Sequence, residues 1–197
     1  QLLRLLAAVM RKLGVLPWLT FVALPAQAAW DIDALMQSLA RHEGGRARFV
    51  ETKNIALLDK PVVSSGELRY QPPARLEKRT LKPKPELMVV DGDTLLFERG
   101  KQKFQVRLAE QPGALAFVDS LRGTLSGDRA TLEKSYKLRL DGDEQRWTLD
   151  LLPSDPRIAA FVLRITFGGS KNQVEWIRYL QADGDSSTMT VEPVAAE

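Results

Sequence analysis

The sequence lacks cysteine and has a single histidine among its 197 residues. Without cysteine the chain has no disulfide, no thiolate metal ligand and no thiol nucleophile, so an apolar core must hold it together. No cysteine follows the apolar N-terminal run to carry a lipid, which predicts a soluble mature chain. The one histidine, His42, is expected in the last turn of a helix, where the helix dipole favours a cation. A Ser-His-Asp triad is therefore poorly supported.

Acidic residues are missing from residues 1–28, which contain the basic residues Arg4, Arg11 and Lys12. These three account for the formal net charge of +3, because the rest of the chain has 25 basic and 25 acidic residues. The basic character therefore does not indicate a nucleic-acid partner. The Trp and Tyr residues alternate with aliphatic residues rather than with Lys or Arg, which also argues against a platform for single-stranded nucleic acid.

Long hydrophobic runs are also missing. The longest near the N-terminus, Leu13–Leu24, has about 12 residues, whereas spanning a bilayer takes roughly 20. Basic residues precede this run and small residues follow it, which is typical of a secretory signal peptide over residues 1–28, cleaved before Ala29. The mature chain, residues 29–197, shows no repeat or linker and is predicted to form one domain in the bacterial periplasm.

Hydrophobic spacing predicts the elements of the mature chain. Asp31 is placed to cap a helix, because apolar residues recur at i, i+3, i+4 and i+7 from Ile32. Beyond this helix, residues 46–58 look strand-like, and short alternating runs separated by Gly, Pro and Asp turns continue the pattern. Residues 111–127 return to helical spacing, and residues 136–191 alternate again.

About ten strands and two main helical segments indicate a mainly β protein with flanking helices, of the α+β class. A sheet of this size must curl strongly or split. We therefore predict a single, strongly curved antiparallel sheet forming an incomplete β-barrel that is closed by helices. An outer-membrane barrel is disfavoured, because helical segments interrupt the strands and Arg and Glu recur where lipid-facing residues should be apolar.

Three pairs of aspartates each flank a glycine: Asp91/Asp93, Asp141/Asp143 and Asp183/Asp185. The continuation of a calcium loop is absent, and turn formation explains the pairs better than a metal site does. We predict no metal, no cofactor and no enzymatic activity. A hydrolase acting on cell-envelope glycans or lipids is the enzyme alternative, and it predicts an acid of raised pKa inside the pocket.

The order of several motifs resembles the LolA family of periplasmic lipoprotein carriers, over about Asp31 to Pro193. These motifs are RARFVETK, SSGELRYQPPARLE, ELMVVDGDTLLFE, WTLDLLP and VEWIRYLQADGDSSTMTV. The resemblance implies an incomplete barrel that holds acyl chains inside. It also implies an acylated lipoprotein or other lipid as cargo, an inner-membrane donor complex and an outer-membrane acceptor. We further expect a monomer.

The resemblance also implies residues of an apolar ligand-binding cavity: Phe49, Leu68, Leu76, Leu95 and Phe97. Strand alternation adds further residues of the same faces: Tyr70, Phe104 and Val106. Four residues of the second helical segment are expected to form a lid: Leu115, Phe117, Val118 and Leu121. In the family, an Arg before the motif's Pro is thought to hold the lid closed. Here that position is Pro72, so Arg75 and Arg79 are the candidates for gating.

The sequence thus predicts a soluble periplasmic carrier that shields acyl chains in an apolar cavity and ferries its cargo toward the outer membrane. Burial of each methylene contributes about 0.8 kcal/mol, so retention needs no catalytic group. A regulatory module of the same fold, which would bind lipid or misplaced lipoprotein and signal rather than ferry, stays open as an alternative.

Overall fold

The structure, a computed structural model, describes residues 30–195, so the predicted signal peptide and its cleavage site lie outside the described residues. Within residues 30–195, no helix combines the length and apolar character needed to cross a bilayer.

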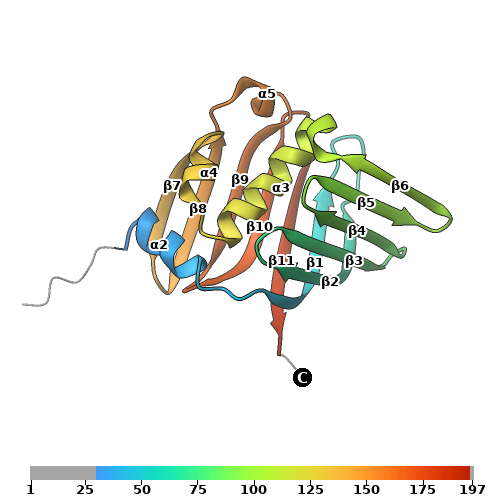
Figure 1. Cartoon of the computed structure of the whole chain (residues 1–197). Coiled ribbons are helices and arrows are strands. Elements are labelled where there is room, and N and C mark those ends of the chain that lie inside the picture. Colours follow the sequence, from blue (N-terminus) through green and yellow to red (C-terminus); the bar gives the residue numbers. More distant parts are fainter. Residues whose placement is uncertain (1–29, 196–197) are drawn as a thin grey trace, which may run out of the picture.

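The described chain is built on one antiparallel sheet of eleven strands (Figure 1). Its strands are β1 Gly45–Asn54, β2 Val62–Gln71, β3 Arg75–Lys82, β4 Glu86–Asp91, β5 Thr94–Arg99, β6 Gln102–Arg107, β7 Tyr136–Asp143, β8 Arg146–Pro153, β9 Val162–Ser170, β10 Gln173–Gln181 and β11 Ser186–Val194. The chain enters the middle of the sheet at β1 and winds outward to the edge strand β6. It then crosses to the opposite edge, β7, and winds back to β11, which pairs with β1.

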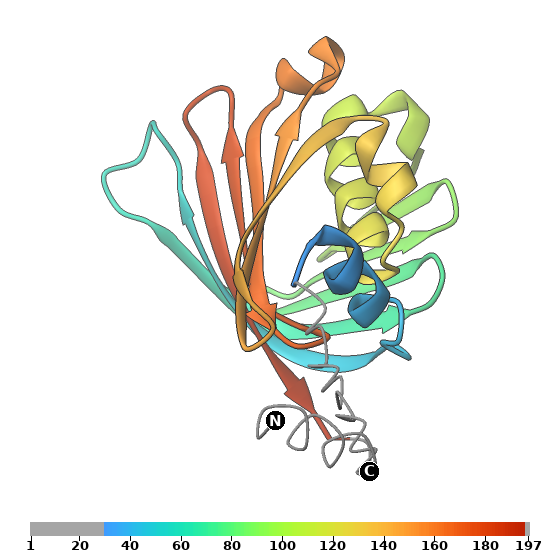
Figure 2. The ribbon, with the colours of Figure 1, turned by 90° about the vertical axis from the view of Figure 1, so that its left-hand side faces the viewer.

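The sheet curves into a half-barrel with most of its helices on the concave side (Figure 2). The helices are α2 Ile32–Leu39, the 3-10 helix η1 Leu108–Glu110, α3 Pro112–Leu125, α4 Arg129–Glu133 and α5 Pro156–Ala159. Asp31 caps α2 as predicted, because its carboxylate accepts the backbone N–H of Ala34 at 2.9 Å. The predicted fold class, an incomplete barrel covered by helices, is confirmed.

Two apolar clusters hold the helices on the sheet. The larger lies under α2 and α4 on the C-terminal half of the sheet, where Leu35, Leu132 and Trp147 are at most 1% exposed. The smaller, built on Val90, Leu108 and Val118, joins α3 to the N-terminal half. Ala116 of α3 belongs to the larger cluster. Helix α3 therefore bridges the two halves.

Two local expectations from the sequence were wrong. The first strand ends at Asn54, and residues 55–58 form a loop in which Leu57 is 94% exposed. This loop is tied to the β10–β11 turn, where the Asp185 carboxylate accepts the backbone N–H of Ala56 at 2.8 Å. The acid pair at residues 141–143 ends β7, so the turn itself lies later than expected, at residues 144–145, although the Asp143 carboxylate still accepts the backbone N–H of Arg146 at 3.0 Å.

Candidate functional site

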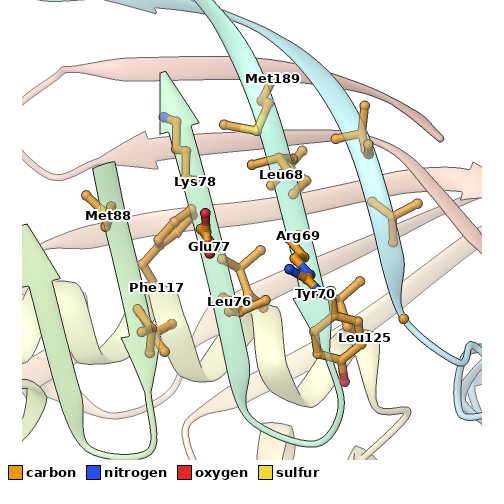
Figure 3. A pocket seen from close by; sticks show the side chains of 18 of the residues that line it. Leu68, Arg69, Tyr70, Leu76, Glu77, Lys78, Met88, Phe117, Leu125 and Met189 are labelled. Carbon is orange, nitrogen blue, oxygen red and sulfur yellow. The ribbon is translucent and has the colours of Figure 1, made fainter. Parts of the chain in front are cut away.

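A cavity of about 1330 Å³ lies under α3, between the two apolar clusters (Figure 3). It exceeds the roughly 300–1,000 Å³ that is typical of pockets for small molecules. Its walls come from α3, from the inner face of β1–β5, and from β10 and β11. The bend of the sheet and the bridging helix together create this space.

The walls of the cavity are mainly apolar. Helix α3 presents a stripe at helical spacing: Ala114, Phe117, Val118, Leu121 and Leu125. The sheet contributes Leu68, Leu76, Val90, Leu95, Val174, Ile177, Met189 and Val191. Because successive side chains of a strand point to opposite faces, these sheet residues all belong to the concave face.

Several of the residues expected to bind ligand line this cavity: Leu68, Tyr70, Leu76, Leu95, Phe117, Val118 and Leu121. Five others are not among the lining residues of the described chain: Phe49, Phe97, Phe104, Val106 and Leu115. Whether any of the twelve contacts a ligand stays a prediction.

The five residues outside the lining have three different surroundings. Phe49 is 2% exposed and lies under the ammonium of Lys78, 4.9 Å from its ring centre. Phe97 and Phe104 stack at 4.9 Å on the concave face beyond α3, and Val106 follows Phe104 on the same face of β6. Leu115 packs against the smaller apolar cluster instead.

Sequence reasoning missed the wall formed by β10 and β11. Ile177, Met189 and Val191 line the cavity there, and Tyr179 packs edge-on against Phe117 of α3 with ring centres 5.1 Å apart. The sequence marked residues 174–180 as a strand that is apolar on both faces. It gave no sign that β11 pairs with β1, which brings this wall opposite the first meander.

Helix α3 is held over the cavity by one polar tie to each half of the sheet. On the N-terminal half, the Arg122 guanidinium donates to the carbonyl oxygens of Ala74, at 2.7 and 3.0 Å, and of Gly92, at 2.6 Å. On the C-terminal half, the buried Tyr136 hydroxyl donates to the carbonyl of Ala116 at 2.9 Å. Burial raises the pKa of Tyr136, so the hydroxyl stays protonated as a donor at neutral pH.

The two arginines expected to gate the lid form ion pairs with carboxylates of the sheet. Arg75 pairs with Asp91 at 2.7 Å, joining the β2–β3 and β4–β5 turns. Arg79 pairs with Glu77 at 3.1 Å on the outer face of β3. A gating role for either stays a prediction. Arg122 could not be identified from the sequence, because its partners are backbone carbonyls that no side-chain pattern reveals.

Charged residues also line one end of the cavity. The Glu51 carboxylate, which is 6% exposed, pairs with the ammonium of Lys78 and lies 3.7 Å from that of Lys53. At the opposite end, the buried Tyr70 hydroxyl finds no hydrogen-bond partner within the described chain. Burial raises its pKa, and nearby Arg122 partly opposes that shift. Figure 3 shows Lys78 and Tyr70 at the two ends of the site.

The cavity lining includes the carboxylates of Glu43, Glu51 and Glu77; that of Glu51 pairs with Lys78 and that of Glu77 with Arg79. Burial raises the pKa of Asp119, although Arg122 opposes the shift; Asp119 lies on α3 outside that lining. Asp143 and Asp185 act in turns, accepting backbone N–H groups of Arg146 at 3.0 Å and Ala56 at 2.8 Å. This geometry does not favour the hydrolase alternative, and the lack of enzymatic activity stays a prediction.

Comparison with known proteins places these features in a family. The sequence profile described as "Outer membrane lipoprotein carrier protein LolA-like" matches residues 24–196, nearly the whole chain. The chain belongs to this LolA-like family. The resemblance read from the motifs is thereby confirmed. A comparison with curated proteins gives no match.

Solved structures similar to this LolA-like chain share little sequence with it. A LolA superfamily protein from Nitrosomonas europaea is 8% identical, with a TM-score of 0.44, covering 86% of this chain and 96% of that one. MucB is 21% identical, with a TM-score of 0.49, covering 85% of this chain and 61% of that one. Lipoprotein LppX from Mycobacterium tuberculosis is 13% identical, with a TM-score of 0.43, covering 84% and 98%.

Proposed function

We propose that this LolA-like protein is a soluble periplasmic carrier that encloses the acyl chains of a lipoprotein or another lipid and ferries them toward the outer membrane. The observation that supports the proposal most is the cavity of about 1330 Å³ with apolar walls on the sheet and on α3. In an otherwise close-packed protein, an apolar space of this size is expected to hold an apolar ligand.

The size of the hydrophobic effect is sufficient for retention. A chain of about fifteen methylenes gains roughly 12 kcal/mol on leaving water, before the costs of association are subtracted. Those costs amount to several kcal/mol, so binding remains favourable without any covalent or catalytic step. Specific polar contacts would add to the affinity rather than create it.

Release requires a competing apolar surface, because transfer follows the difference in affinity between two sites. We propose an inner-membrane donor complex and an outer-membrane acceptor for these steps, with the carrier acting as a monomer. Opening of the cavity requires α3 to move away from the sheet. The ties made by Arg122 and Tyr136 are the contacts that such a movement would break.

A matched pair of substitutions in neighbouring strands tests the proposal. Leu68→Glu places a charge on the cavity wall, whereas Val50→Glu places the same charge on the outer face, where Val50 is 48% exposed. We expect the delipidated protein to bind a fluorescent fatty acid, Leu68→Glu to weaken binding at least tenfold, and Val50→Glu to leave it unchanged. Circular dichroism and thermal melts establish that both variants fold.

The contrary results are equally specific. If the folded wild-type protein takes up no acylated probe, the carrier proposal is wrong. If Leu68→Glu and Val50→Glu bind the probe equally well, the cavity under α3 is not where the acyl chain lies.

A further inference from the structure

The polar group of the bound lipid has a candidate site at one end of the cavity. We infer that Lys53 and Lys78, with Glu51 between them, form a subsite for an anionic head group, a carboxylate or a phosphate, whose acyl chain lies along the apolar walls. We call these three residues the cationic end. The inference rests on the proposed function, since it assigns the head group of the lipid that the cavity would hold.

The position of Lys78 in the sheet is the first argument. Alternation along β3 puts Leu76, Lys78 and Thr80 on the concave face, and Lys78 lies between Leu68 and Met88 of the flanking strands. Its ammonium reaches across β2 to Phe49 and Glu51 of β1. Gly66 occupies β2 between Phe49 and Thr80, so no side chain obstructs this route.

The second argument is the balance of charge. Two ammonium groups share one carboxylate, which leaves one positive charge in excess at the cationic end. A buried ion pair adds little to stability once the cost of desolvating both partners is counted. The stability of the sheet therefore does not explain why these charges lie on its concave face. Arg46, Arg69 and Glu77 also line the cavity, but they belong to the opposite parity of their strands.

The third argument is what happens when a lipid fills the cavity. An acyl chain displaces water from around Lys78, whose side chain is 24% exposed. The free-energy cost of keeping its ammonium charged therefore rises, because the group loses hydration. A neutral lipid leaves Lys78 with the Glu51 carboxylate as its ionic partner, and Lys53 shares that carboxylate. An anionic head group offsets the cost with charge-assisted hydrogen bonds, which strengthen as water is excluded.

Neighbouring side chains extend the cationic end with groups suited to polar parts of a lipid. Ser187 faces Lys53 across the β1–β11 ladder, and Tyr179 faces Ser187 across the next ladder. Both line the cavity. The mainly apolar walls of α3 and the inner sheet extend from this end toward Tyr70 and Leu125 (Figure 3). The cavity therefore has the amphipathic layout of the ligand that we infer.

Matched lipids test the inference on delipidated protein. Palmitate is compared with its methyl ester, and lysophosphatidate with the monoacylglycerol of the same chain length, all below the concentrations at which they aggregate. We expect at least one anionic lipid to bind about tenfold more tightly than its neutral partner, as a charge-assisted hydrogen bond provides. The pair with the larger difference identifies a carboxylate or a phosphate as the head group.

Two substitutions at the cationic end should act in opposite directions. Lys78→Met should abolish the preference for the anion and leave the neutral lipid unaffected. Glu51→Gln should strengthen anion binding, because it removes the carboxylate that competes for both ammonium groups. Lys137→Met, which removes an exposed lysine on β7, is the control of equal charge and should change neither.

The outcomes separate the two proposals. Binding of neither kind of lipid overturns the proposed function itself. If the anionic and neutral lipids of a pair bind equally, or if Glu51→Gln weakens binding of the anionic lipid, the anionic subsite is wrong. Neither result contradicts the carrier function. If Lys78→Met fails to fold, the comparison of anionic with neutral lipids on the wild-type protein and the effect of Glu51→Gln still test the anionic subsite.

Discussion

At the scale of single residues, Arg122 is the side chain that connects the cover of the cavity to the sheet. Its guanidinium donates hydrogen bonds to the carbonyl oxygens of Ala74 and Gly92, which lie in two different hairpin turns. The Arg75–Asp91 pair joins the same two turns beside it. These contacts make the fit of α3 on the N-terminal half depend on a few polar groups as well as on packing.

Removing this guanidinium should loosen α3. Arg122→Leu is expected to speed hydrogen exchange of the α3 amides about tenfold, because hydrogen bonds from a charged donor contribute roughly 1.5–3 kcal/mol. Arg129→Leu is the control, since Arg129 forms exposed ion pairs with Asp33 and Glu133, both at 2.8 Å, which add little. Equal exchange in the two variants would show that packing alone holds the helix.

Asp119 makes stability depend on pH. Burial raises its pKa above the ordinary 3.8, so the folded state binds the proton more tightly than the unfolded state does. Stability is therefore lost as the pH rises from about 4 through the folded pKa, and the loss persists at neutral pH. Asp119→Asn should raise the melting temperature at about pH 7 and leave it unchanged near pH 3. A lower melting temperature at about pH 7 would mean that the charge stabilises α3.

At the scale of elements, the strands of the C-terminal half are fitted to each other through glycine and tryptophan. Gly168 of β9 lies opposite Trp176 of β10, and a Cβ at Gly168 would overlap the indole ring. At the next residue of β9, a Cβ at Gly169 would lie 2.8 Å from the buried ring of Trp147. The two tryptophans thus pack closely against β9 because it has no side chains at these positions.

Gly168→Ala should therefore destabilise the protein by about 1–3 kcal/mol, the usual cost of overpacking. Urea unfolding measures this cost, and Trp176→Ala shows whether the ring is its cause. In the double variant the added methyl no longer meets the indole, so the effects should be less than additive. Strict additivity would place the strain in the backbone instead.

The sequence was sufficient to predict most of the helices and strands but not how the strands pair with each other. Alternation identifies strands because one face of this sheet is covered and the other is exposed, and Leu68 and Tyr70 show that pattern clearly. The pattern fails at residues 55–58, where four consecutive apolar residues form an exposed loop. It also cannot show the β1–β11 pairing, which joins segments more than one hundred residues apart.

The candidate site was predictable to a similar degree. Helical spacing in α3 identified Phe117, Val118 and Leu121, which line the cavity. Arg122 and Lys78 were missed for a physical reason: a charged residue is expected to point to solvent, and Lys78 in addition lies between the charged residues Glu77 and Arg79. Only the three-dimensional structure shows that one binds carbonyls and the other reaches into the cavity wall.

At the scale of the whole molecule, the cavity follows from the width of the sheet. Eleven strands make a concave face too wide for the helices to fill. Helices α2 and α4 pack on the C-terminal half, and the N-terminal half meets only one side of α3. The space between the two clusters is the cavity that we propose for a ligand, and Phe97 and Phe104 stack on the concave face outside its lining.

The central claim, that this space holds acyl chains, is tested most directly by native mass spectrometry. The protein is purified from its own host and its ligands are extracted. We predict one acylated species per protein, lost in a folded Leu95→Glu/Phe97→Glu variant. Protein that is lipid-free as isolated and takes up no lipid when offered it would contradict the account.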